Sequence, residues 1–136
     1  MCLKAPRAVQ LLMMVVGSLA ASGALAQDAA GGVGPDDLAR AKKLYMTCAA
    51  CHTNDGSGKH SAGPNLADVA GRPIGKAKGF SFSPAMKSAK GFWTPQKLDE
   101  FLKSPSAAMP GTNMAFAGIA NEQDRAAMVR FLSKKP

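Results

Sequence analysis

The sequence holds few of the residues that build metal sites and redox-active thiol pairs. It contains three cysteines and two histidines, and after residue 26 these reduce to Cys48, Cys51, His52 and His60. A structural zinc site needs four ligands, commonly including a second Cys or His pair. A thioredoxin-like Cys-x-x-Cys needs a strand–helix–strand setting, and no strand pattern surrounds these cysteines. The sequence therefore argues against both kinds of site.

Groupings that would carry catalysis are also missing. There are no paired carboxylates, no nucleophile beside a base and no oxyanion arrangement, so an enzyme is not expected. Gly56, Gly58 and Gly75 lack the context of a phosphate-binding loop. The net charge is +8, which suits an acidic protein or an anionic surface as partner. Because the lysines are scattered and no aromatic platform accompanies them, nucleic acid is not expected.

The strongest pattern that is present is Cys48-Ala49-Ala50-Cys51-His52. Two cysteines three apart, followed directly by a histidine, form the attachment motif of a c-type haem. Cysteines at this spacing lie on one side of a helical turn, so both can reach one porphyrin edge. We therefore expect one covalent haem c on Cys48 and Cys51, with His52 as an axial ligand of the iron.

Residues 1–26 have the composition of an export signal. Lys4 and Arg7 precede an apolar segment over 8–20, and Ala24-Leu25-Ala26 is a small-x-small cleavage site. We predict cleavage after residue 26 and a periplasmic location.

The rest of the chain then divides into a flexible segment over 27–34 and a single domain over 35–136. No stable membrane insertion is expected after cleavage. An uncleaved anchor over residues 8–26 is the alternative, although that segment is near the lower length limit for a membrane span.

Helix start and stop patterns predict an all-α domain. Pro35 begins a helix that runs into the cysteine motif, and a short helix is expected over 65–70. Thr94 caps a helix that ends before Pro105, and Asn121 caps the last helix. The predicted helices are joined by loops.

The loops are expected over 53–64, 72–91 and 104–118. Phe80 and Phe82 should pack inward from the second of these. Loops of this length are unusual in a bare domain, but they suit a chain that wraps a cofactor.

Several side chains could supply the second axial ligand of the iron. His60 shares a loop with His52 and should instead bond a backbone carbonyl. Met46 and Met128 lie on helices and should pack. The candidates are Met46, Met86, Met109, Met114, Met128 and His60.

The remaining methionines are in loops. Met86 is flanked by Ser, Ala and Lys and is expected to be poorly shielded from water. Met109 and Met114 share a Pro/Gly loop, and the pattern leaves them almost equal. Pro110 biases Met109 to extended backbone, which favours Met114 modestly.

Taken together, these motifs resemble those of class I cytochromes c of the mitochondrial and bacterial periplasmic type. The resemblance covers nearly all of the sequence after residue 26. It rests on Cys48-Ala49-Ala50-Cys51-His52-Thr53, Gly58-Lys59-His60, Gly63-Pro64-Asn65-Leu66, Gly71-Arg72, Trp93, Leu98 to Leu102, Pro110-Gly111-Thr112-Asn113-Met114-Ala115-Phe116, Arg125 and Phe131-Leu132.

The resemblance implies a fold in which the first and last helices cross and short helices and loops wrap one covalent haem. It also implies that Met114 is the second axial ligand and that the Pro64 carbonyl accepts a hydrogen bond from His52. His60 would join its loop to another loop.

Further haem contacts follow from the resemblance. Trp93 would donate to a haem propionate and Arg72 would neutralise one. Thr112 and Asn65 would be minor polar neighbours of the haem, and Phe116 would cover its exposed edge.

The function implied is that of a soluble monohaem electron carrier in a respiratory or related chain. It would be a monomer, with a reductase or dehydrogenase as donor and an oxidase or reaction centre as acceptor. Two alternatives stay open. One is a membrane-tethered carrier, and the other is a haem sensor or peroxidase-like protein with an open iron position.

The sequence also departs from the family pattern. Ala41 replaces a glycine at the helix crossing, and Phe82 replaces a tyrosine that binds a propionate. The lysines that ring the haem edge in mitochondrial members are largely absent, which predicts an encounter less sensitive to salt. Their places are taken by Thr47, Ser61, Ser106, Ala107 and Asn113, whereas lysines cluster at 76, 78, 87 and 90.

Overall fold

Five helices and long loops make up the described residues, 35–134, of the computed structural model. The predicted export signal and flexible segment lie outside these residues. The helices are α1 (Pro35–Ala49), α2 (Pro84–Ser88), α3 (Pro95–Lys103), α4 (Pro105–Ala108) and α5 (Glu122–Leu132). Within 35–134 there is no strand beyond one antiparallel bridge between Pro73 and Phe92. The predicted all-α class is confirmed.

The predicted helix caps explain where the longer helices begin. Thr94 accepts a hydrogen bond from the Lys97 amide at 3.2 Å, and Asn121 accepts one from the Asp124 amide at 2.9 Å. Pro95 occupies the first turn of α3, where its missing N–H costs nothing. The helices predicted from these caps are confirmed.

Three local predictions were wrong. Residues 65–70 form turns rather than a helix, because the Asn65 side chain accepts from the Ala67 amide at 2.7 Å and Asp68 has a φ of 55°. The loops predicted over 72–91 and 104–118 contain the short helices α2 and α4, each with a proline in its first turn. A single helical turn is too short to leave a periodic pattern.

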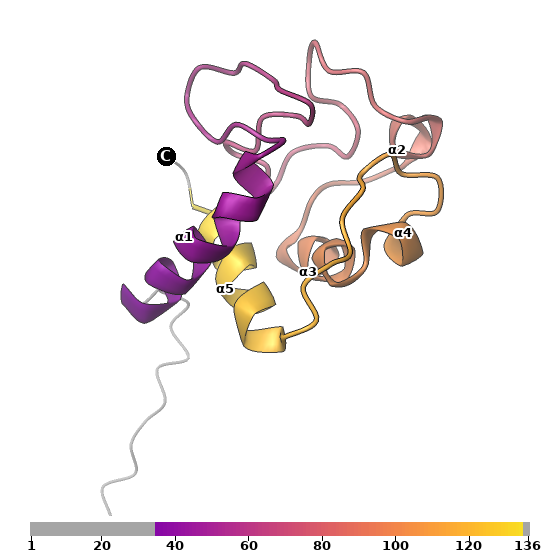
Figure 1. Cartoon of the computed structure of the whole chain (residues 1–136). Coiled ribbons are helices and arrows are strands. Elements are labelled where there is room, and N and C mark those ends of the chain that lie inside the picture. The colour runs from indigo at the N-terminus through magenta and orange to yellow at the C-terminus, as the bar shows by residue number, and fades with distance from the viewer. Residues whose placement is uncertain (1–34, 135–136) are drawn as a thin grey trace, which may run out of the picture. The chain divides into compact units, whose positions relative to one another are not determined.

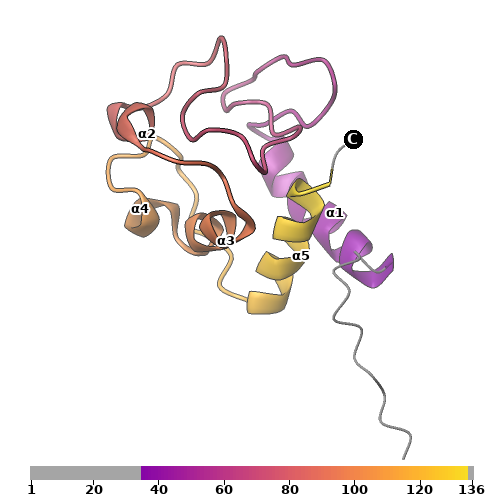
Figure 2. The same cartoon turned by 180° about the vertical axis from the view of Figure 1, so that it is seen from behind.

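Helices α1 and α5 cross directly, and both views in Figures 1 and 2 show them side by side. Ala41 of α1 and Ala127 of α5 are completely buried. The rings of Tyr45 and Phe131 lie 5.4 Å apart between their centroids. Small side chains let the backbones approach, and the aromatic pair closes the crossing on one side.

Ion pairs reinforce the same crossing. The Arg40 guanidinium lies 2.7 Å from an Asp124 carboxylate oxygen, and Arg130 lies 2.7 Å from Asp37. All four side chains are partly exposed, so each pair contributes at most about 1 kcal/mol.

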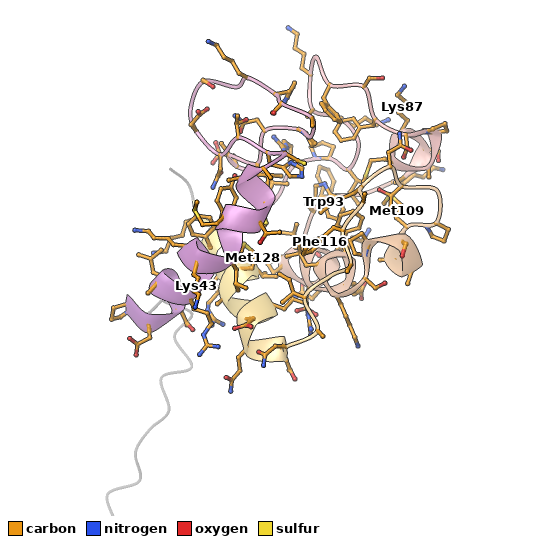
Figure 3. The ribbon with its side chains drawn as sticks, in the orientation of Figure 1. Lys43, Lys87, Trp93, Met109, Phe116 and Met128 are labelled. Carbon is orange, nitrogen blue, oxygen red and sulfur yellow. The ribbon has the colours of Figure 1, made fainter. Side chains whose placement is uncertain are left out.

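Helix α3 is joined to α5 by Arg125, which is 7% exposed. Its Nε donates to Asp99 at 2.7 Å, and Nη1 donates to the Ile119 carbonyl at 3.1 Å. The core beside these contacts includes Leu98, Leu102 and Met128. Figure 3 places Met128 on α5.

Met46 does not pack as predicted, because 72% of it is exposed on α1. None of the helices within residues 35–134 has the length and apolar character that a membrane crossing would require.

Replacing Ala41 with Leu should destabilise the protein, because the fully buried position at the helix crossing has no room for a branched side chain. We expect the free energy of unfolding to fall by about 1–3 kcal/mol, measured by denaturant titration of the haem-loaded protein. Ala39 is exposed on the same helix, so Ala39→Leu should change the stability by less than about 0.5 kcal/mol. Equal losses in the two variants would contradict tight packing at Ala41.

Candidate haem-binding site

A cavity of about 430 Å³ lies beside the end of α1. Its wall is mostly apolar and includes Leu66, Val69, Leu98 and Phe101. The polar and sulfur-bearing groups in the wall come from segments far apart in the sequence. They include Thr47, Cys48, Cys51, His52, Pro64, Arg72, Ser81, Ser83, Met86, Trp93, Thr112, Asn113 and Met114.

One end of the cavity is formed where α1 ends. The amides of Cys51 and His52 both donate to the Cys48 carbonyl, at 3.0 and 2.9 Å, so the helical turn continues through the motif. Cys48 is half-buried and Cys51 is exposed, and both are free thiols that line the cavity. Burial raises the pKa of the Cys48 thiol above its ordinary value. The turn thus places the two sulfurs and the imidazole on one cavity.

The His52 ring is oriented by the segment that follows. Its Nδ1 lies 2.7 Å from the Pro64 carbonyl oxygen. Because a carbonyl can only accept, Nδ1 carries the proton and Nε2 keeps its lone pair. A Cβ on Gly63 would lie 2.6 Å from Nδ1. Glycine is therefore required for the close approach of this backbone to the ring.

Tyr45 of α1 also contacts the backbone of His52, a role that the sequence pattern did not predict. Its hydroxyl donates to the His52 carbonyl at 3.3 Å. Burial is the largest cause that raises the pKa of the Tyr45 phenol, so the hydroxyl stays protonated and able to donate. The only sequence signal is an aromatic residue seven positions before His52.

Met114 lies in the loop between α4 and α5 and also lines the cavity. Its amide donates to the Thr112 hydroxyl at 3.3 Å, and the Thr112 amide donates to the Met109 carbonyl at 3.0 Å. Met109 is partly buried against the core but does not line the cavity. Figure 3 labels Met109 and Phe116 in this part of the chain.

Met86 was predicted to be poorly shielded from water, and this prediction was wrong. Only 8% of it is exposed, and it lines the cavity together with Met114. The Ser83 hydroxyl accepts from the Met86 amide at 3.2 Å and begins α2. This cap turns Met86 inward despite its polar neighbours. A Ser-Pro pair three and two residues before it was the available signal.

Two hydrogen-bond donors stand in the remaining wall. Arg72 donates to the Asn65 carbonyl at 2.9 Å, and it has no ion-pair partner among residues 35–134. Burial lowers the pKa of Arg72, which shows that the cation is partly desolvated. Trp93 is 9% exposed, packs in a tilted arrangement against Phe101 with the ring centroids 5.0 Å apart, and donates its ring N–H to no described residue. Both donors suit an anionic group of a bound molecule.

His60 lies outside the cavity wall, and its two ring nitrogens are already engaged. Nδ1 accepts from the Asn65 amide at 2.9 Å, and Nε2 lies 2.9 Å from the Lys78 carbonyl, to which it donates. The ring therefore joins the loop after His52 to the loop before α2.

These groups fit a covalently held haem. The cavity has a mostly apolar wall for a flat macrocycle and is lined by two cysteines three residues apart. A histidine nitrogen with a free lone pair and a thioether supply two types of iron ligand found in this class of protein. Arg72 and Trp93 supply donors for carboxylates.

Comparison with known proteins agrees with this arrangement. Residues 38–135 match the family model described as Cytochrome c. The chain is 44% identical to cytochrome c-type cyt cy of Rhodobacter capsulatus over 101 residues, which are 74% of this chain and 50% of that protein. It is 41% identical to cytochrome c of Chlamydomonas reinhardtii over 72% of this chain and 88% of that protein.

A solved structure shows the same fold. Cytochrome cH from Methylobacterium extorquens superposes with a TM-score of 0.66 and 33% sequence identity, covering 71% of this chain and 96% of that one. The chain spans half the length of the Rhodobacter relative and most of the length of the other two. The predicted family and fold are confirmed, and this chain belongs to the cytochrome c family of electron carriers, whose haem is covalently attached.

Proposed function

We propose that this cytochrome is a diffusing one-electron carrier whose haem iron is bound by His52 and Met114. Support comes from one observation above all: these side chains belong to separate segments, yet both line one cavity beside the cysteine motif. His52 and Met114 would supply both protein ligands of the iron, and a methionine ligand raises the reduction potential. A closed iron suits electron transfer better than ligand binding or peroxide chemistry.

Cys48 and Cys51 would hold the haem by thioether bonds. When bound, the haem supplies a one-electron iron couple. The Pro64 carbonyl keeps His52 in the tautomer that can ligate, through the 2.7 Å contact at Nδ1. This is the supporting contact that ligating histidines commonly make.

The other cavity residues would hold and shield the haem. Arg72 and Trp93 would bind its propionates, Thr112 would be a polar neighbour, and Phe116 would cover the edge beside Met114. Because the wall is mostly apolar, little water would have to reorient when the charge on the site changes. Small rearrangement favours fast electron transfer.

The cellular setting is part of the same proposal. Cleavage after residue 26 would release a monomeric periplasmic protein. Its donors would be a reductase or dehydrogenase, and its acceptors an oxidase or a reaction centre.

The mass of the protein purified from the periplasm tests that setting. We expect a chain that begins at Gln27 and carries one haem, measured by intact-mass spectrometry. A mass that retains residues 1–26, with the protein in the membrane fraction, would instead identify a tethered carrier.

The ligand assignment is tested by removing each loop methionine from the haem-loaded protein. In Met114→Ala the long-wavelength thioether–iron band should disappear, and carbon monoxide should bind the ferrous protein. The reduction potential should fall by about 0.1 V or more, since axial ligands set haem potentials over roughly 0.8 V.

Two variants serve as matched controls. Met109→Ala removes a thioether outside the cavity, and Met86→Ala removes one inside it. Both should retain the thioether–iron band. If either of them loses the band while Met114→Ala keeps it, the assignment of Met114 is refuted.

Gly63→Ala tests whether the close approach of this backbone to the His52 ring is needed to position the ring. An added methyl group would lie 2.6 Å from Nδ1, so the ring or the backbone must move. We expect a loss of about 1–3 kcal/mol in the free energy of unfolding, together with a changed low-spin spectrum. Gly56 has open space around its Cβ position, so Gly56→Ala should leave the spectrum unchanged. An unaltered spectrum in Gly63→Ala would show that this glycine is not needed to position His52.

A further inference from the structure

A long acid-free segment forms a distinct part of the surface. Between Val69 and Leu98 there is no Asp or Glu. The segment contains five lysines, all exposed, and one exposed phenylalanine. We call these six residues the lysine face: Lys76, Lys78, Lys87, Lys90, Lys97 and Phe92.

The charge of the lysine face is not neutralised within the described residues. The three ion pairs in residues 35–134 all use arginine and join α1 or α3 to α5. No lysine takes part in an ion pair there. Asp99, just beyond the segment, is bound to Arg125 at 2.7 Å. The positive charges of the lysine face therefore have no carboxylate partner among the described residues, and a partner molecule can supply one.

Backbone contacts bring these lysines together. Lys76 Nζ donates to the Lys87 carbonyl at 2.8 Å, and Lys97 Nζ reaches the Lys90 carbonyl at 3.5 Å. A Cβ on Gly91 would lie 3.0 Å from Lys97 Nζ. Two pairs of lysines are thus neighbours, and one of them adjoins Phe92.

Phe92 is held outward by a short antiparallel pairing. The Trp93 amide donates to the Arg72 carbonyl at 2.9 Å, and the Ile74 amide donates to the Gly91 carbonyl at 3.0 Å. Neighbouring residues of an extended segment point to opposite sides. Because Trp93 points into the cavity and is 9% exposed, Phe92 points out and is 57% exposed. The ring is therefore presented by a fixed backbone.

The lysine face also adjoins the haem cavity. Pro73 lines the cavity and forms the bridge with Phe92, so a molecule on Phe92 is one layer of backbone from the cavity wall. The positions around the family's usual docking edge carry no charge and are exposed here: Thr47, Ser61, Ser106, Ala107 and Asn113.

We propose that the lysine face is the docking surface for an acidic protein partner that presents an apolar or aromatic group within its acidic patch. Charge complementarity selects the partner, and the exposed phenyl ring beside Lys90 and Lys97 supplies an apolar contact. This proposal rests on the proposed electron-carrier function. The uncharged haem edge predicted an encounter with the partner that is less sensitive to salt. The lysine face instead predicts an encounter that depends on salt.

Two soluble polymers can serve as probes of the haem-loaded, reduced protein: poly-L-glutamate and a random copolymer of glutamate and tyrosine. Binding is measured by calorimetry at low and high salt, and its site by amide chemical shifts. We expect the shifts to fall on residues 73–97 and the copolymer to bind more tightly than polyglutamate. High salt should weaken both.

Matched variants separate location from net charge. Lys87→Glu/Lys90→Glu should weaken binding by on the order of tenfold at low salt. Lys42→Glu/Lys43→Glu changes the net charge equally on the exposed side of α1 and should weaken binding much less. Figure 3 shows Lys43 and Lys87 on different parts of the molecule. Equal losses in the two double variants would overturn the proposal.

The phenyl ring is tested by Phe92→Ser, which should abolish the preference for the copolymer. Met46→Ser removes another exposed apolar side chain, 72% exposed on α1, and should preserve that preference. If Phe92→Ser also preserves it, the ring has no role and the proposal fails.

A membrane is the competing occupant. It is tested with vesicles of phosphatidylcholine and phosphatidylglycerol in equal parts. If these vesicles bind through the same residues at a salt concentration that releases both polymers, the protein-docking proposal is overturned. The thioether–iron band should persist, and carbon monoxide should not bind the ferrous protein, in all of these variants. A failure of docking is therefore distinguishable from a failure of the His52 and Met114 assignment.

Discussion

The site depends on the contact between His52 and the backbone of Gly63 and Pro64. The 2.7 Å hydrogen bond from Nδ1 to the Pro64 carbonyl decides which ring nitrogen keeps a lone pair. It forms only because Gly63 has no side chain where the ring lies. Tyr45 donates to the His52 carbonyl from the helix behind. These contacts from α1 and from the loop after the cysteine motif together hold the histidine in one orientation.

Much of the chain around the cavity is loop, and a few polar contacts hold it. His60 joins the loop after the cysteine motif to the Lys78 carbonyl. Asn65 is 3% exposed, and its side-chain Nδ2 donates to the Lys59 carbonyl at 3.2 Å. The loops also contribute Val69, Ile74 and Trp93 to the buried core. A covalent haem would add a large apolar surface for the cavity wall to pack against, so the cofactor would complete the core as well as carry the electron.

Charged residues divide into two groups with different roles. Arg40, Arg125 and Arg130 are taken up in ion pairs that join α1 and α3 to α5. The lysines of the lysine face have no such partners in the described residues. Arginine suits fixed ion pairs because its planar group bonds carboxylates in defined directions, whereas lysine is a hydrated point charge on a flexible stem. The positive charges of the arginines therefore stabilise the fold through ion pairs, whereas those of the lysines can interact with a partner.

Local chemistry was enough to predict part of this structure. The capping residues Thr94 and Asn121 fixed the starts of α3 and α5, and the cysteine motif with its following histidine identified the haem class. These features act over a few residues, so the sequence by itself determined them. The turns over 65–70 also come from a local contact, since the Asn65 side chain accepts from the Ala67 amide, but apolar spacing does not encode such a contact. Only the tertiary structure decided that Met46 lies outside and that Met86 and Met114 line one cavity. Those outcomes depend on which distant segments pack together, and the order of residues along the chain does not state this.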